Sequence, residues 1–155
     1  MGDLTSQDLA MNSPPGIADI HAAAIRLSGL IVETPLIESP ELNKRFGARI
    51  LFKPETLQRT GSFKFRGAYN KLSSLTEEER SRGVVAFSSG NHAQGVAASA
   101  AMFGVKAVIA MPTDAPAMKV GNVRKMGAEV VPFDRFRDDR MAVVRPYMDR
   151  GMVLV

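Results

Sequence analysis

The chain has 155 residues and a mass of 16.8 kDa, which is enough for one domain with a buried core. Hydrophobic residues make up 45% and charged residues 23% of the sequence, close to the averages of soluble globular proteins, so extensive disorder and a membrane protein are not expected. Cysteine is absent, which excludes disulfides and thiolate metal sites. The net charge of +4 comes mainly from residues 119–150, where interspersed charges are typical of a solvated helix face and not of nucleic-acid binding.

The N-terminal region divides into a tail and a first helix. Residues 1–15 contain turn formers and no hydrophobic periodicity, so we expect a disordered tail. They contain no lysine or arginine and therefore lack the basic region of a signal peptide, and we expect a cytoplasmic protein. Helical spacing of apolar residues then predicts a helix over 17–30.

Three short elements are predicted next. Residues 34–37 have the pattern of a short extended segment, and residues 49–52 that of a strand. Between them, Ser39 followed by Pro40 is typical of a helix start, and we expect this helix to end near Phe46.

The second half of the chain repeats one pattern. Short apolar runs centred near Val85, Val108, Val130 and Val153 recur every 22 or 23 residues. Parallel strands need crossovers of a dozen or more residues, so this spacing predicts right-handed βαβ units and an α/β fold with a parallel sheet.

Individual residues mark the ends of the helices in this half. Thr76 and Glu79 have the spacing of a capping box, and Gly104 is placed to end the first crossover helix. Pro146 should kink or shorten the last helix.

The segment TGSFKFRGA, residues 60–68, places Lys64 between two phenylalanines and just before a predicted helix. An amine is a nucleophile only when it is unprotonated, so a catalytic lysine needs desolvation or neighbouring positive charge, which Phe63, Phe65 and Arg66 would provide. On residue types alone a second interpretation stays open, in which Lys64 and Lys71 lie on the exposed face of an amphipathic helix.

A second loop, SSGNH at residues 88–92, lies between a buried strand and a helix of small residues. Free amides at a helix N-terminus, serine hydroxyls and a glycine form a natural site for a carboxylate or phosphate. An ordinary N-capping turn is the alternative. No Walker A pattern and no GxGxxG follows a strand, so a Rossmann-like nucleotide binder is disfavoured.

Together, these motifs resemble the serine/threonine dehydratase family of pyridoxal-phosphate enzymes. The residues from Thr60 to Ala68, with Glu55, are similar to its cofactor attachment signature, and SSGNHAQGVA is similar to its substrate-carboxylate loop. The resemblance extends from Ile17 to Val155 and includes ETPL and GAEVV. It implies the parallel three-layer αβα sandwich of fold-type II pyridoxal-phosphate enzymes, and pyridoxal 5'-phosphate as cofactor.

The resemblance also implies roles for single residues. Lys64 would form the Schiff base with the cofactor and later act as the base at Cα, and Phe63 would lie near the cofactor ring. Asn91 would hydrogen-bond the 3′ oxygen of the cofactor. The substrate carboxylate would be held by Ser88, Ser89, Gly90, Asn91 and His92.

The same resemblance implies a domain organisation. Residues 16–52 would be the N-terminal part of a large domain, 53–151 the small domain, and 152–155 the start of the return to the large domain. The family's core is longer, so we expect this chain to be an N-terminal portion of it. A homodimer is expected at full length, and no metal, nucleic-acid or membrane partner.

The implied function is β-elimination, the dehydration and deamination of a small hydroxy amino acid such as L-threonine or L-serine to a 2-oxo acid and ammonia. Serine racemase or 3-hydroxyaspartate ammonia-lyase activity on the same scaffold is the alternative, and Ser89 leaves racemisation open because the matching serine is the second acid/base in racemases. A catalytically inactive fragment or partner-binding module is an alternative of another class.

Overall fold

The computed structural model describes residues 14–155, so most of the predicted tail at residues 1–15 lies outside the described residues. The predicted first helix is α2 (Ile17–Leu27), which is three residues shorter than expected. Helix α3 (Pro40–Phe46) confirms the predicted start, because the Ser39 hydroxyl accepts a hydrogen bond from the amide of Leu42.

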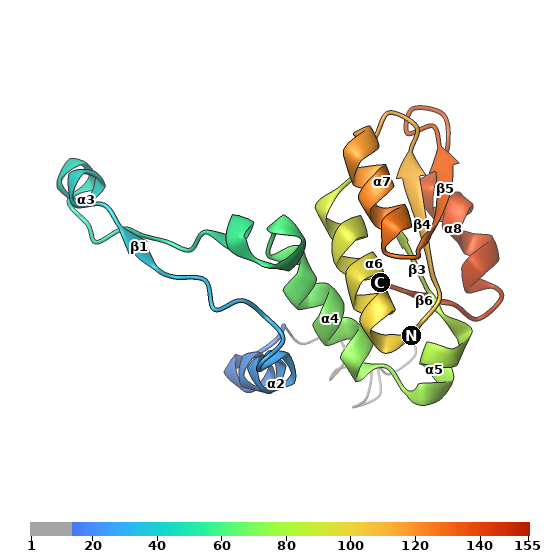
Figure 1. Cartoon of the computed structure of the whole chain (residues 1–155), viewed down its shortest axis with the longest axis horizontal. Helices are drawn as coiled ribbons and strands as arrows, with labels where there is room; N and C mark the ends of the chain where they lie inside the picture. Colours follow the sequence, from blue (N-terminus) through green and yellow to red (C-terminus); the bar gives the residue numbers. More distant parts are fainter. Residues whose placement is uncertain (1–13) are drawn as a thin grey trace, which may run out of the picture.

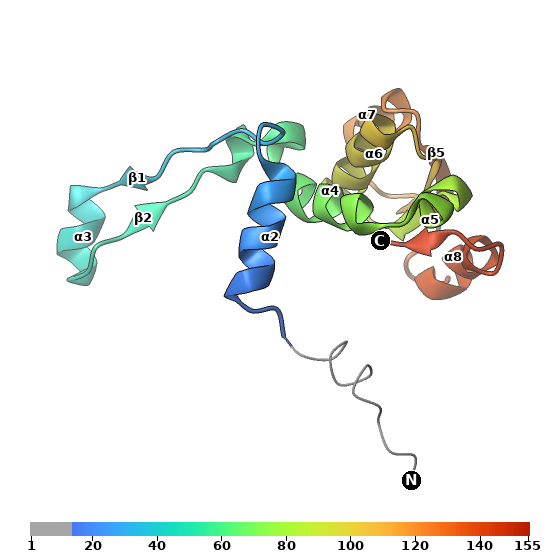
Figure 2. The same cartoon turned by 90° about the horizontal axis from the view of Figure 1, so that it is seen from below.

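Helix α3 connects two strands of two residues each, β1 (Ile37–Glu38) and β2 (Leu51–Phe52), which pair in antiparallel fashion. These elements form an arm that extends away from the rest of the molecule (Figure 1 and Figure 2). The predicted extended segments are therefore confirmed, although each forms fewer ladder residues than expected.

The chain returns from the arm through two 3-10 turns, η1 (Glu55–Leu57) and η2 (Arg59–Gly61), and enters α4 (Lys64–Ser74). Helix α5 (Glu77–Arg82) begins with the predicted capping box. In it, the Thr76 hydroxyl accepts from the Glu79 amide at 3.1 Å, and the Glu79 carboxylate accepts from the Thr76 amide at 2.8 Å.

A four-stranded sheet contains the predicted apolar runs as β3 (Val84–Phe87), β4 (Ala107–Pro112), β5 (Glu129–Phe133) and β6 (Val153–Leu154). The strand order is β5-β4-β3-β6, and every pairing is parallel. The spacing of the apolar runs thus predicted the sheet correctly.

Helices cover both faces of this sheet. Helices α6 (Asn91–Phe103) and α7 (Ala117–Lys125) lie on one face and α8 (Arg140–Met148) on the other, as Figure 1 shows. Strand residues alternate between the two cores: Val84 and Ala86 pack with α6, whereas Val85 packs with α8. This arrangement is the predicted αβα sandwich.

The predicted helix ends agree with the structure. Gly104 ends α6 in the left-handed conformation with φ of 63°. Helix α8 contains Pro146 and ends two residues later, at Met148. Within residues 14–155, no helix has the length and apolar character needed to cross a bilayer.

Candidate active site

Lys64 is the first residue of α4, and it lies where α4 crosses α6. The crossing is close because Gly95 of α6 has no side chain. A Cβ atom at residue 95 would lie 3.1 Å from the carbonyl carbon and oxygen of Lys64 and 3.2 Å from the amide nitrogen of Phe65. The small residues of α6 therefore bring its N-terminal loop next to Lys64.

A cavity of about 360 Å³ opens beside Lys64. Its lining includes Phe63, Gly67, Lys71 and His92, and the Lys64 Nζ lies 5.1 Å from the centroid of the Phe63 ring. Among the described residues, no carboxylate lies within ion-pair distance of Lys64. Both lysines of the amphipathic-helix interpretation thus lie at one cavity, and Lys64 is exposed. Of the neighbours expected to shield or repel its charge, Phe63 lies beside the amine, whereas Phe65 is buried in the core and Arg66 pairs with Glu55.

The loop at residues 88–92 connects β3 to α6. The Ser88 hydroxyl accepts from the Gly90 amide at 3.2 Å, and α6 begins at Asn91. As at any helix start, the first amides of α6 have no partner within the helix and are available to an anion. His92 lies on the Lys64 side, with its Nε2 3.0 Å from the Val155 carbonyl oxygen.

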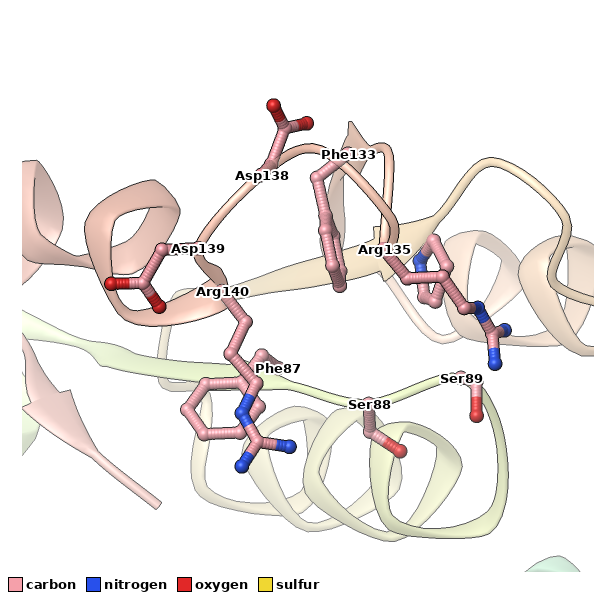
Figure 3. Close-up of a pocket in the computed structure, with 9 residues that line it drawn as sticks. Phe87, Ser88, Ser89, Phe133, Arg135, Asp138, Asp139 and Arg140 are labelled. Carbon is pink, nitrogen blue, oxygen red and sulfur yellow. The ribbon is translucent and has the colours of Figure 1, made fainter.

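A second cavity, of about 590 Å³, lies beyond Ser88 and Ser89 where β3, β4 and β5 end (Figure 3). Two arginines, Arg135 and Arg140, reach into it from the segment that follows β5. The carboxyl ends of parallel strands meet at one edge of a sheet, which is where α/β folds usually bind their ligands.

Arg140 is the arginine in this second cavity that has no carboxylate partner within residues 14–155. Its guanidinium lies 4.8 Å from the centroid of the Phe87 ring, whereas Arg135 forms an ion pair with Asp114 at 2.7 Å. Asp138 and Asp139 also line this cavity, and their carboxylates accept hydrogen bonds from backbone amides instead of from Arg140. The Arg140 guanidinium in the second cavity is therefore available to bind an anionic group.

An ion pair braces α4 just after Lys64. The Arg66 guanidinium donates to both carboxylate oxygens of Glu55, at 2.7 Å each, and the Thr34 hydroxyl donates to Glu55 at 2.6 Å. The hydrogen bonds from Arg66 lower the pKa of Glu55 to about 2. Three separate sequence segments are joined at this carboxylate.

The structure thus places the predicted site residues around one loop. Lys64, Phe63 and His92 line the smaller cavity, Ser88 and Ser89 line the larger one, and the loop that carries Gly90 and Asn91 separates the two. Sequence reasoning missed Arg135, Arg140 and Lys119, whose Nζ donates to the Asn91 side chain at 3.2 Å. The sequence signal that could have identified these three residues is that each follows the end of a predicted parallel strand.

Comparison with known proteins decides the family. The profile of the pyridoxal-phosphate-dependent enzymes matches residues 27–154. The chain belongs to this family. It is 51% identical over 138 residues to an L-threo-3-hydroxyaspartate ammonia-lyase of a Pseudomonas species, which covers 88% of this chain and 43% of that protein. It is 50% identical over 115 residues to the L-threonine ammonia-lyase of Thermotoga maritima, covering 74% of this chain and 29% of that protein.

The fold comparison agrees with the family. The structure of maize serine racemase matches with a TM-score of 0.85 and 36% identity, covering 92% of this chain and 44% of that one. The predicted fold of the type II pyridoxal-phosphate enzymes is therefore confirmed, as is the predicted cofactor of the family. The chain spans less than half the length of these curated relatives.

The residues around Lys64 fit the ring end of pyridoxal phosphate. A primary amine with no carboxylate partner among residues 14–155 stands beside an aromatic ring, in a cavity with the small residues Gly67 and Ala68. An amine is what the aldehyde of the cofactor requires for covalent attachment, and an apolar wall is what its flat ring requires. In the same part of the chain, no group of three acidic or histidine side chains is arranged to hold a metal ion.

Proposed function

We propose that this protein catalyses pyridoxal-phosphate-dependent β-elimination of a small β-hydroxy amino acid to a 2-oxo acid and ammonia. The position of Lys64, in a cavity beside the N-terminal loop of α6, is the observation that carries the proposal. The names of the relatives add support, because ammonia-lyases acting on L-threonine and on 3-hydroxyaspartate are among them.

Each predicted site residue then has a role in the proposed reaction. The bound cofactor supplies an electron sink for the charge that develops at Cα. Lys64 would hold the cofactor, and its amine would take the proton from Cα. Asn91 would donate from its amide to the 3′ oxygen of the cofactor, and Phe63 would lie near the cofactor ring. The hydroxyls and amides of residues 88–92 hold the substrate carboxylate.

The reaction balances without an added oxidant or reductant. The Cα proton leaves to the base, the Cβ–O bond breaks, and the hydroxyl departs as water after it gains a proton. Hydrolysis then takes up one water and releases ammonia, so the net products are the 2-oxo acid and ammonia. Water must therefore reach the product, which agrees with a site that opens to solvent.

Arg140 favours a substrate with a second carboxylate. Its guanidinium faces the larger cavity across from Ser88, and no carboxylate of the described chain neutralises it. We therefore propose 3-hydroxyaspartate as the preferred substrate over threonine and serine. One hydrogen-bonded charge pair is worth about ten- to hundredfold in rate.

The substrate proposal is tested by Arg140→Gln. The ratio of kcat/KM for 3-hydroxyaspartate to that for threonine should fall about ten- to hundredfold, because only the former presents a carboxylate to residue 140. Arg145→Gln, on the exposed side of the same helix, is the matched control and should leave the ratio unchanged. An unchanged ratio in Arg140→Gln would exclude this role.

Racemisation is the second candidate, because Ser89 lines the larger cavity and its hydroxyl makes no hydrogen bond within residues 14–155. A free hydroxyl at this loop is available as a second acid/base. Chiral chromatography of L-serine incubations tests it: D-serine should form with the unsubstituted protein and be lost in Ser89→Ala. Absence of D-serine in both samples would leave elimination as the sole activity.

Cofactor attachment is tested by incubating the protein with pyridoxal phosphate, reducing with borohydride and mapping the labelled peptide. Label should appear at Lys64 and not at Lys71, which lines the same cavity and serves as an internal control. Lys64→Arg should abolish the label. Equal labelling of both lysines would favour the inactive fragment or partner-binding module.

We also propose that residues 16–52 belong to the large domain of the fold and 53–151 to the small domain. Strand β6 pairs with β3, which favours adding residues 152–155 to the small domain instead of the large one. The homodimer and the cytoplasmic location stay predictions. Light scattering coupled to size-exclusion chromatography tests for the homodimer.

A further inference from the structure

Two side chains of α7 donate hydrogen bonds to two side chains of α6. The Nζ of Lys119 donates to the Asn91 Oδ1 at 3.2 Å, and the Nδ2 of Asn122 donates to the Gln94 Oε1 at 3.0 Å. The first bond reaches the loop of the candidate active site, whereas the second lies one turn further along both helices.

The Lys119 side chain reaches this loop because residue 90 is glycine. A Cβ atom at Gly90 would lie 2.8 Å from the Lys119 Nζ and 3.2 Å from its Cδ. Any side chain at residue 90 would therefore displace the ammonium group. Among residues 14–155, Lys119 has no carboxylate within ion-pair distance, so its charge faces the loop without a counterion from the described chain.

The chemistry of this contact fixes the orientation of the Asn91 amide. A lysine ammonium has three donors and no acceptor, so it can bond only to the amide oxygen. The amide NH₂ group of Asn91 must then point the other way. Within the same residues it has no acceptor, and it is free to donate to an electronegative atom in the site.

We propose that Lys119 is a positioning residue that holds Asn91 with its NH₂ group directed toward the cofactor oxygen. This inference rests on the proposed function. In this role Lys119 would act through Asn91, to which it donates its hydrogen bond. Without it, the Asn91 amide rotates, and for part of the time presents its oxygen, which repels a partly negative cofactor oxygen.

The first test measures Asn91 in the protein without cofactor. Nuclear magnetic resonance should give an ordered Asn91 side-chain amide, and Lys119→Met should lower its order parameter below about 0.6, the range of flexible groups. Asn122→Ala removes the second bond between the same helices and is the matched control, expected to leave the Asn91 order parameter unchanged. No change in Lys119→Met, or the same change in both variants, would overturn the proposal.

The second test uses the protein loaded with pyridoxal phosphate. Lys119→Met should shift the absorption maximum of the bound cofactor and lower kcat/KM about ten- to hundredfold, while Lys119→Arg, which keeps a charged donor, should restore much of both. In the Asn91→Ala background, Lys119→Met should have no further effect. Additive effects would show that Lys119 acts independently of Asn91.

These tests separate the inference from the function on which it rests. If borohydride labels no particular lysine, the proposed function fails, while the order parameter of Asn91 still reports whether Lys119 holds it. If Lys64 is labelled and the Asn91 amide is equally ordered without Lys119, the function stands and the inference fails.

Discussion

Glu55 shows how one side chain can join distant sequence motifs. It accepts from Arg66 in the lysine motif and from Thr34 in the ETPL motif, and Lys53 donates to the Thr34 carbonyl oxygen at 2.8 Å. The side chains of Glu55 and Arg66 are only 16% and 25% exposed, so the pair is shielded from the solvent that weakens surface ion pairs. The start of α4, and with it Lys64, is fixed by this carboxylate.

This pair predicts acid sensitivity. The pKa of Glu55 is lowered from 4.5 to about 2, so its contribution to stability is complete above pH 4.5 and is lost as the pH falls toward 2. Glu55→Gln should lower the free energy of unfolding at pH 7 by about 1–3 kcal/mol and reduce its decline between pH 4.5 and 2. Urea unfolding at a series of pH values measures both.

The matched control for this prediction is Glu78→Gln. Glu78 pairs with Arg82 on the surface, where its side chain is 84% exposed, and loss of such a pair should cost less than about 1 kcal/mol. Equal losses for Glu55→Gln and Glu78→Gln at pH 7 would contradict a bracing role for Glu55.

At the level of residues, sequence analysis singled out the candidate attachment lysine and the loop at residues 88–92 because both are contiguous motifs. Sequence analysis did not identify Arg140 and Lys119, because each approaches this loop only after the chain has folded. Their neighbours in the sequence carry no motif, and interspersed basic residues between 119 and 150 are typical of a solvated surface. Only the parallel register of β3, β4 and β5 brings these side chains to one edge.

At the level of elements, the crossing of α4 and α6 determines the geometry of the site. The two helices approach so closely at Gly95 that backbone meets backbone. The small residues of α6 permit close packing, but the sequence does not reveal that the partner is the Lys64 peptide itself. The distance between the lysine and the loop is set at this contact.

Gly95→Ala should therefore destabilise the protein by about 1–3 kcal/mol, because the added methyl group meets backbone atoms that cannot rotate away. Thermal or urea unfolding measures the change. Gly121→Ala in α7 is the matched control: apart from its chain neighbours and the nearby backbone of α7, no atom lies within 4 Å of the added Cβ, so alanine should stabilise by about 0.5–1 kcal/mol. A neutral Gly95→Ala would mean that α4 and α6 can separate without cost.

At the level of the whole molecule, the arm and the αβα body differ in how they are held. The arm is joined by two strands of two residues, and it exposes large apolar side chains such as Phe46 (62%) and Ile37 (50%). The sheet of the body is covered on both faces, and Val84, Val85 and Ile109 are fully buried. Regular periodicity predicted the body well, whereas the arm has elements too short to produce a periodic signal.

We predict that amide hydrogen exchange will separate these two regions. Amides of β3 and β4 should exchange last, through global unfolding, because these strands are the central pair of the sheet and most of their residues are buried. Amides of β1 and β2 should exchange first, through local opening of a very short ladder. Mass spectrometry of peptides after timed labelling distinguishes the two, and equal protection of arm and body would contradict the prediction.

The paired hydrogen bonds between α6 and α7 have a consequence for changes in chain length. Lys119 and Asn122 stand three residues apart, as do their acceptors Asn91 and Gln94, so sliding α7 by a single position would break both bonds together. A residue inserted in the turn at 104–106, which joins α6 to β4, leaves this match intact, whereas one inserted between Lys119 and Asn122 destroys it. An insertion within this segment of α7 would therefore separate the two bonds, so that at most one of them could form.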